Sequence, residues 1–219
     1  MAPASRVPAG RRTLDPNEVP DVVVLRLPLY VRALSQLHAA GSEVVSSQEL
    51  GSLLQMTPAQ IRKDLSYFGR FGKQGRGYKV QFLRHELRQI LGLDRQWPAC
   101  LIGVGNLGQA IINYPGFAPE GFTIVAAFDN DDELVGTDVR GLTVRPMSDL
   151  GDVISGGLIS IGVVAVPASQ AQPVIDQLVE AGVGGILNYA PVAPKVPMSI
   201  VIRNIDPVLS LQSMTFYLL

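Results

Sequence analysis

The chain contains few residues of several reactive types. Its 219 residues include one cysteine, two histidines and one tryptophan. The single cysteine, Cys100, excludes an intramolecular disulfide framework and a metal site built from cysteines. No stretch approaches the roughly 18–20 uninterrupted apolar residues of a transmembrane helix, and the N-terminus has no basic segment followed by an apolar core. We therefore expect a cytoplasmic protein with no membrane partner and no metal.

Charge is low and unevenly distributed. Charged residues make up 17% and hydrophobic residues 47% of the chain, which is enough apolar mass for a packed core. The first 95 residues hold 14 Lys and Arg against 8 Asp and Glu, whereas the remaining residues hold 4 against 11. This asymmetry predicts two modules and a polyanionic partner for the basic one, although a solvated basic face would have the same composition.

The N-terminal stretch predicts a tail followed by helices. Residues 1–20 are rich in Pro, Ala and Arg and lack periodicity, as is typical of a disordered tail. Apolar residues recur near helical spacing from Pro28 to Ala40. Ser46 then forms a capping-box pattern with a glutamate three residues on, and Thr57 forms one with Gln60. Two short helices joined by a tight turn, the second ending near residue 68, predict a helix-turn-helix.

The second of these helices has two different faces. At 100° per residue, Ile61, Leu65 and Phe68 fall on one side and are expected to pack. The opposite side carries Ala59, Arg62, Lys63, Ser66 and Arg70. Arginine pairs with guanine edges in the major groove and lysine contacts phosphate or guanine, so this face is suited to reading DNA. The alternative is an ordinary solvated helix face.

A glycine-punctuated basic stretch follows at Gly72–Tyr78, which reads GKQGRGY. Such a stretch predicts a hairpin, and a hairpin beside a helix-turn-helix would form a wing that contacts the DNA backbone or minor groove. A further amphipathic helix is predicted over Gln81–Leu91. The residues predicted to bind DNA are Ser46, Gln60, Arg62, Lys63, Ser66, Tyr67, Lys73, Arg76 and Tyr78.

Beyond Trp97, strand-like apolar runs alternate with helical patterns. The predicted strands are Cys100–Gly103, Phe122–Phe128, Ile159–Val166, Gly185–Asn188 and Ser199–Ile205. The clearest helix is predicted over Ser169–Ala181. This alternation predicts an α/β domain with a doubly wound parallel sheet.

A glycine-rich turn carries the strongest chemical signal. Gly103, Gly105 and Gly108 form G-x-G-x-x-G after an apolar strand and before a helical pattern that starts at Asn106. Asp129 ends the next strand, 21 residues after Gly108, where a carboxylate accepts hydrogen bonds from a ribose and repels a 2′-phosphate. The pattern predicts a site for NADH and NAD+ rather than NADP, the alternative being a glycine turn that binds nothing.

Residues suited to hydride-transfer catalysis are scarce. Residues 96–219 contain no histidine, Lys195 is their only lysine, and no Tyr-x-x-x-Lys spacing occurs in the chain. The nucleotide is therefore predicted to be a ligand that is sensed, and Cys100 a small core residue. Two alternatives are an NAD-dependent oxidoreductase with a basic accessory domain and a nucleotide-binding scaffold for a protein partner.

Taken together, these motifs resemble the Rex family of redox-sensing transcriptional repressors, from about Leu25 to Leu218. The most specific stretches are RLPLYVR (Arg26–Arg32), IRKDLSYFGRFGKQGRGYKV (Ile61–Val80), IGVGNLGQAIINYPGF (Ile102–Phe117), VPASQAQ (Val166–Gln172) and LNYAP (Leu187–Pro191). The resemblance implies a winged helix over residues 21–95, a Rossmann-like domain over 96–205 and a C-terminal helix over 206–219. That helix would reach across a homodimer.

The resemblance also implies a mechanism and several residue roles. Such dimers bind palindromic operator DNA, which NADH releases and NAD+ permits. Tyr114 and Asp206 would lie near the nicotinamide, and Arg26 would make an interdomain contact that Asp206 can join. This chain departs from the usual pattern at Asp132, Tyr189 and Pro207. The residues predicted to bind NADH and NAD+ are Gly103, Val104, Gly105, Asn106, Leu107, Gly108, Tyr114, Asp129, Val166, Pro167, Asn188 and Asp206.

Overall fold

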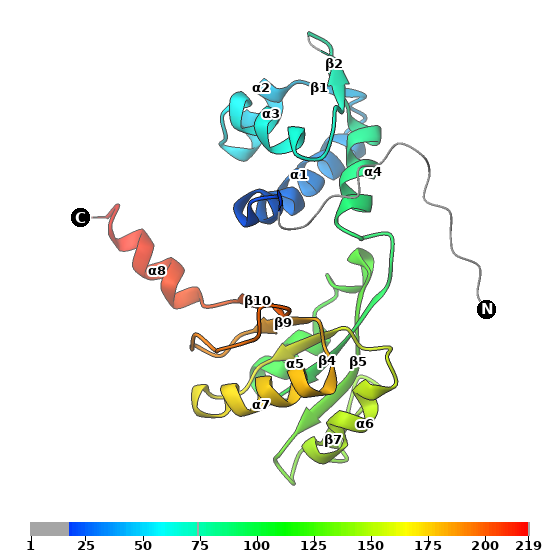
Figure 1. Ribbon diagram of the computed structural model, residues 1–219, viewed down its shortest axis with the longest axis vertical. Coiled ribbons are helices and arrows are strands. Elements are labelled where there is room, and N and C mark those ends of the chain that lie inside the picture. Colours follow the sequence, from blue (N-terminus) through cyan, green and yellow to red (C-terminus); the bar gives the residue numbers. More distant parts are fainter. Residues whose placement is uncertain (1–17, 74, 219) are drawn as a thin grey trace, which may run out of the picture. The chain divides into compact units, whose positions relative to one another are not determined.

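The computed structural model describes residues 18–73 and 75–218. The chain divides into two compact units, Met1–Asp94 and Arg95–Leu219, called unit 1 and unit 2 below (Figure 1). The predicted tail lies outside the described residues as far as position 17, and Val19 is already buried. Among the described helices, none combines the length and the hydropathy needed to cross a membrane.

Unit 1 is a winged helix. Its elements are α1 (Asp21–Ala39), β1 (Val44–Val45), α2 (Ser47–Leu54), α3 (Pro58–Ser66), β2 (Gly72–Lys73), β3 (Gly77–Lys79) and α4 (Val80–Ile90). The three strands pair antiparallel in the order β1-β3-β2. The predicted helix-turn-helix is therefore α2 and α3, and the predicted hairpin is β2 and β3. The four helices share one core, built around Leu34, Leu50, Ile61, Leu83 and Leu87.

Helix α1 begins earlier than the sequence pattern predicted. It starts at Asp21, whereas the prediction placed the start at Pro28, which instead lies inside the helix. Proline removes one main-chain hydrogen bond from a helix interior. Val23 and Leu27 are nevertheless buried on the same side as Tyr30 of the following turn. Because these contacts lie on both sides of Pro28, packing compensates for the missing hydrogen bond.

Unit 2 alternates strands and helices. Its elements are β4 (Trp97–Ile102), α5 (Asn106–Asn113), η2 (Ala118–Glu120), β5 (Phe122–Asp129), β6 (Asp138–Val139), β7 (Leu142–Pro146), η3 (Met147–Asp149), α6 (Leu150–Ser155), β8 (Ile161–Val164), α7 (Ala168–Ala181), β9 (Gly185–Asn188), β10 (Val201–Asn204) and α8 (Pro207–Thr215). The five predicted strands are all present, but β6 and β7 were missed. Both are short, and polar residues interrupt their apolar ones, so neither gives a continuous apolar run.

The sheet of unit 2 has the order β10-β9-β8-β4-β5-β7-β6. All pairs are parallel except β6–β7 at one edge. Numbered along the chain without β6, the strands follow the order 3-2-1-4-5-6 of doubly wound dinucleotide-binding domains. Side chains of β4 alternate between two cores: Ala99 and Leu101 pack with Ile111 of α5, while Cys100 and Ile102 pack with residues of α6 and α7. Both faces of the sheet are therefore covered.

Helix α8 follows β10 and has no buried residue. Asp206 caps it by accepting a hydrogen bond from the main-chain NH of Val208 at 2.9 Å. Pro207 occupies the first turn, where a missing NH costs nothing. The departure from the family pattern at this position is therefore compatible with the start of the helix. Its exposed apolar residues are Val208, Leu209, Leu211 and Met214, continued beyond its end by Phe216, Tyr217 and Leu218.

Candidate nucleic-acid interface and nucleotide site

The two helices of the helix-turn-helix begin where the caps were predicted. The main-chain NH of Glu49 donates to the Ser46 hydroxyl at 3.0 Å, and the Glu49 carboxylate accepts from the NH of Ser46 at 2.7 Å. These bonds to Ser46 lower the pKa of Glu49. Thr57 caps α3 by accepting from the NH of Gln60 at 3.2 Å. Capping sets the first turn of each helix. The predicted capping box is confirmed at Ser46, whereas at Thr57 only the hydroxyl cap forms and the Gln60 amide donates to Asp64 instead.

The outward face of α3 carries the predicted cations. Arg62, Lys63 and Ser66 are exposed, whereas Ile61 and Leu65 are buried. The Arg62 guanidinium donates to the hydroxyl of Ser47 on α2 at 2.9 Å, which steadies its long side chain. The helix ends at Ser66, two residues before the predicted end, and Tyr67 is its C-terminal cap. The face available for DNA is therefore about two turns long.

A hollow of about 630 Å³ separates this helix pair from the hairpin. It is lined by Ser46, Ser47, Arg62, Gly72, Gly75, Gly77 and Tyr78. Three predicted DNA-binding residues thus lie together here, and burial raises the pKa of Tyr78. Ser47 was missed, because its position in the first turn of α2 suggested only a helix start.

Arg76 lies in a neighbouring hollow of about 600 Å³. That hollow is lined by Val44, Arg70, Phe71, Gly72, Arg76, Gly77, Lys79 and Phe82. Three cations therefore gather beside the hairpin, where a phosphate backbone would be attracted. The Lys73 side chain lies outside what the structure describes.

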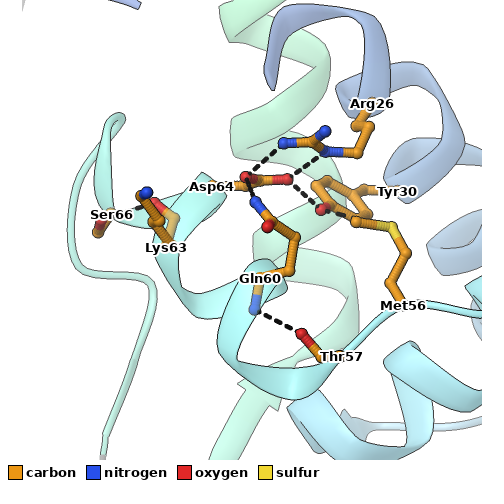
Figure 2. Close-up of polar contacts among 8 residues, drawn as sticks. All are labelled: Arg26, Tyr30, Met56, Thr57, Gln60, Lys63, Asp64 and Ser66. Carbon is orange, nitrogen blue, oxygen red and sulfur yellow. Dashed lines mark hydrogen bonds and ion pairs between the residues drawn. The ribbon is translucent and has the colours of Figure 1, made fainter. Parts of the chain in front are cut away.

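Gln60 and Arg26 are held by a residue that the sequence did not single out. Asp64 of α3 is completely buried and accepts hydrogen bonds from the Gln60 amide and the Arg26 guanidinium (Figure 2). The amide nitrogen of Gln60 is thus bound to Asp64 within unit 1, and the side chain cannot offer its complete amide to a base. The interdomain contact of Arg26 stays a prediction.

The three glycines of the turn after β4 play different parts. Gly103 has φ +93°, and a Cβ there would meet the carbonyl oxygen of Ala165 at 2.5 Å. A Cβ at Gly108 would collide with the carbonyl oxygen of Gly103. Around Gly105, by contrast, a Cβ would meet nothing within 4 Å. The first and third glycines serve packing, whereas the second leaves open space where a pyrophosphate can approach the backbone.

Asp129 lies beside this turn and holds it. Its Oδ2 accepts from the main-chain NH of Val104 at 2.6 Å, and its Oδ1 accepts from the NH groups of Asn130 and Asp131 at 2.7 and 3.0 Å. No side chain caps the N-terminus of α5, which starts at Asn106. The first amides of α5 therefore point to a position where an anion is favoured. These residues fit a dinucleotide.

The other predicted nucleotide-binding residues follow the carboxyl ends of parallel strands. Val166 and Pro167 join β8 to α7, and Asn188 ends β9. Asn188 is completely buried, and its amide nitrogen donates to Ala190 at 3.0 Å and to the Asn204 side chain at 2.9 Å. Its side chain therefore shapes the edge of the sheet. Ligands of such sheets bind at this edge, beside the point where the strand order reverses.

Tyr114 and Asp206 stay predictions as nicotinamide contacts. Tyr114 follows α5, is 58% exposed and packs edge-on against Phe117 with ring centroids 5.1 Å apart. Asp206 is the cap of α8. Within residues 18–73 and 75–218, these contacts of Tyr114 and Asp206 are with residues close to them in the sequence.

A winged helix with a cationic outer face, joined to a doubly wound sheet with a glycine-rich turn, defines a class of two-domain regulators that bind DNA and respond to a nucleotide. Two family models match accordingly. One, described as a putative DNA-binding protein N-terminus, matches residues 18–66. The other, described as a CoA binding domain, matches residues 94–192.

Curated relatives are more specific. A protein of Chloroflexus aggregans named Redox-sensing transcriptional repressor Rex is 52% identical over 92% of this chain and 95% of its own length. Its namesake in Roseiflexus sp. is 50% identical over 92% of both chains. The chain belongs to the Rex family of redox-sensing transcriptional repressors.

Solved structures of a relative match most of the chain. The protein RSP in complex with beta-NAD+ and operator DNA superimposes with a TM-score of 0.87 at 39% identity, covering 91% of this chain and 92% of that one. RSP in complex with beta-NADH gives a TM-score of 0.83 at 37% identity, covering 91% and 94%. Another structure of RSP is described as that of a Rex-family repressor.

Proposed function

We propose that this protein represses transcription by binding operator DNA through unit 1 and releases that DNA when NADH binds unit 2. The observation that carries the proposal is the pairing of an exposed cationic face on α3 with a glycine turn open at Gly105. RSP, a relative similar in both units, was solved with operator DNA and beta-NAD+ and with beta-NADH.

DNA reading is assigned to α3 and the hairpin. Arg62 and Lys63 project from the exposed face, and the hollow beside Tyr78 gives the backbone of a duplex room to approach. Arg76 and the cations around it supply attraction that does not depend on sequence. The helix would enter the major groove while the hairpin contacts the flanking strand.

Nucleotide sensing is assigned to the edge of the sheet in unit 2. The turn at Gly105, the first amides of α5 and the Asp129 carboxylate would hold the adenosine and pyrophosphate. NADH and NAD+ share those groups and differ at the nicotinamide ring, in charge and in planarity. A ligand shifts an equilibrium only by its differential affinity for two states. The residues that distinguish the two forms must therefore touch the ring, and we assign this role to Tyr114 and Asp206.

We further propose that the nucleotide is not consumed. The curated relatives are named as repressors. Unit 2 has no histidine, and its only lysine, Lys195, is exposed. The unit therefore lacks the histidine that most often serves as general acid for a substrate carbonyl.

Helix α8 supports a homodimer. Leu209 and Leu211 are 62% and 61% exposed, and the apolar side chains around them are at least half exposed as well. Contiguous apolar surface of this kind marks an interface. On α1, Val22, Leu25 and Leu29 form a second exposed apolar stripe at helical spacing. We propose that α8 packs on a second copy, and a two-fold dimer would match a palindromic operator.

The decisive experiment titrates DNA binding with each nucleotide. The unaltered full-length protein first selects duplexes from a random-sequence library, which supplies the probe. Fluorescence anisotropy then measures its affinity for that duplex with NADH, with NAD+ and without nucleotide. We expect NADH to weaken binding at least tenfold, a coupling of about 1.4 kcal/mol, and NAD+ to leave it nearly unchanged. Equal effects of the two nucleotides would contradict redox sensing.

A further inference from the structure

The recognition helix α3 carries a buried carboxylate with a full set of partners. Asp64 is completely buried, and each of its oxygens accepts two hydrogen bonds (Figure 2). Oδ2 accepts from Arg26 Nε at 2.6 Å and from the Tyr30 hydroxyl at 2.6 Å. Oδ1 accepts from Arg26 Nη2 at 2.8 Å and from Gln60 Nε2 at 2.6 Å. Two of the donors come from α1, so the network joins α1 to α3.

The charge on Asp64 is maintained in spite of its burial. Desolvation by itself would raise the pKa of Asp64, but the bonds from Arg26, Tyr30 and Gln60 outweigh it and leave the pKa below its ordinary value. Burial and the bond to Asp64 in turn raise the pKa of Tyr30 well above its usual range, so its hydroxyl keeps the proton that it donates. The network is thus a stable arrangement of one anion and three donors at neutral pH.

Such a network orients α3 rather than strengthening its attachment to the core. A buried ion pair is often no more stabilising than apolar residues of the same volume. The apolar contacts of Ile61 and Leu65 already hold α3 against the core, but apolar packing is not directional. The paired bonds between Arg26 and Asp64 are directional, because the planar guanidinium meets both carboxylate oxygens. They therefore fix the rotation of α3 about its own axis.

Rotation of this helix matters for base reading. Arg62, Lys63 and Ser66 lie on the side of α3 opposite its packed face. Side-chain ends lie about 5–6 Å from a helix axis, so a rotation of about 20° moves them by roughly 2 Å. That displacement exceeds the tolerance of a hydrogen bond to a base edge, whereas a phosphate contact by a flexible cation adapts to it.

We propose that Asp64 is a positioning residue for sequence discrimination, which it sets through the rotation of α3 without touching DNA. Gln60 then belongs to this network, because its amide nitrogen is bound to Asp64. Arg26 and Tyr30, on α1, act through their hydrogen bonds to Asp64. The inference rests on the proposed DNA-binding function and adds the part of unit 1 that determines how selective binding is.

The test compares two duplexes with the full-length Asp64→Asn variant. One is the duplex selected by the unaltered protein, and the other is a scrambled duplex of the same length and composition. Asparagine keeps the shape of the side chain, but an NH2 group replaces one carboxylate oxygen. The two donors that were bound to that oxygen then face another donor. We expect the affinity ratio between the two duplexes to fall at least tenfold. Affinity for the scrambled duplex should stay within twofold, and the salt dependence of binding should be unchanged because phosphate contacts remain.

A matched control separates positioning from stability. Leu87 of α4 is completely buried in the same core, and its apolar side chain cannot hydrogen-bond to the network. Leu87→Val should lower the melting temperature of unit 1 and leave the affinity ratio unchanged. If Leu87→Val and Asp64→Asn lower the ratio in proportion to their melting temperatures, Asp64 only stabilises the fold and the proposal is overturned.

A milder variant covers the case in which Asp64→Asn does not fold. Tyr30→Phe removes one donor and keeps the ring in the core, so an intermediate loss of the affinity ratio is expected. An unchanged ratio in a folded Tyr30→Phe protein, with Asp64→Asn unfolded, would overturn the proposal. Failure of the proposed function is distinguishable, because the unaltered protein would then select no duplex at all.

Discussion

The main-chain NH of Val104, in the turn after β4, donates to Oδ2 of Asp129 at the end of the adjacent strand β5, at 2.6 Å. Asp129 therefore holds the glycine-rich turn, and we propose that the same carboxylate also accepts hydrogen bonds from the ribose of a bound nucleotide. Both tasks depend on the same carboxylate, so one substitution tests them together.

Asp129→Ala should weaken NADH binding. Hydrogen bonds to a charged acceptor contribute about 1.5–3 kcal/mol, so the dissociation constant should rise at least about tenfold. Isothermal titration calorimetry measures this directly. Asp132→Ala is the control, because it removes an equal charge from an exposed position in the same loop. Unchanged NADH affinity in Asp129→Ala would place the adenosine elsewhere.

Gly105→Ala should weaken nucleotide binding strongly without unfolding unit 2. The residue has φ −64°, and an added Cβ meets no atom of the protein within 4 Å, so the melting temperature should be almost unchanged. The methyl group would occupy space needed by the pyrophosphate, and NADH affinity should fall more than about tenfold. Gly151→Ala, another open position at the start of α6, should alter neither property. Full NADH binding by Gly105→Ala would argue against this turn as the phosphate site.

The Arg62→Ala, Lys63→Ala double variant should lose affinity for the selected duplex. A base contact by arginine contributes about 1–3 kcal/mol, and each lost phosphate contact lowers the salt slope by about one. NADH affinity should not change. A charge-matched control replaces Arg145 and Lys195, exposed cations of unit 2, by alanine. DNA binding that is equal in the two double variants would remove α3 as the reading helix.

Leu209→Glu with Leu211→Glu should dissociate the dimer. Burying a leucine contributes about 1.5–3 kcal/mol, and placing carboxylates there adds desolvation, so dimer affinity should fall at least about a hundredfold. Light scattering during size-exclusion chromatography would report a monomer mass. Gln212→Glu adds charge to the same helix at a polar position and should leave the dimer intact. A dimer that persists in the double variant means that α8 does not form the interface.

Cys100 should be unreactive in the folded protein. Burial raises the pKa of its thiol to about 12, whereas an unfolded cysteine titrates near about 8.5. The folded state thus keeps its proton where the unfolded state loses it. The resulting stability is fully present below about pH 8.5 and is lost as pH rises toward 12.

Two measurements check this behaviour. A thiol reagent at pH 8 should label Cys100 only at the rate of unfolding. The melting temperature of the unaltered protein should fall more steeply above pH 9 than that of Cys100→Ala. Rapid labelling of the native protein would show that the thiol is accessible and would contradict this prediction.

Features carried by neighbouring residues could be predicted from the sequence. The caps at Ser46 and Thr57 need only a hydroxyl and an NH three residues away, and the turn at Gly103 needs only residues that lack a Cβ. The predicted strands followed from continuous apolar runs, which report burial on both faces of a sheet. For that reason β7, with polar residues among its apolar ones, gave no such signal.

Pairings between distant residues were decided by the tertiary structure. Asp64 is a residue type usually found at the surface, and its burial in α3 is compensated by hydrogen bonds that include those from Arg26, 38 positions earlier. Helix α1 likewise extends through Pro28 because residues on both sides of the proline are buried in the core and stabilise the helix. The sequence by itself determined where the capped helices α2 and α3 and the glycine-rich turn begin, since those signals act over three or four residues. The order of the strands and the partner of each buried charge depend on packing across the whole unit, which no local pattern encodes.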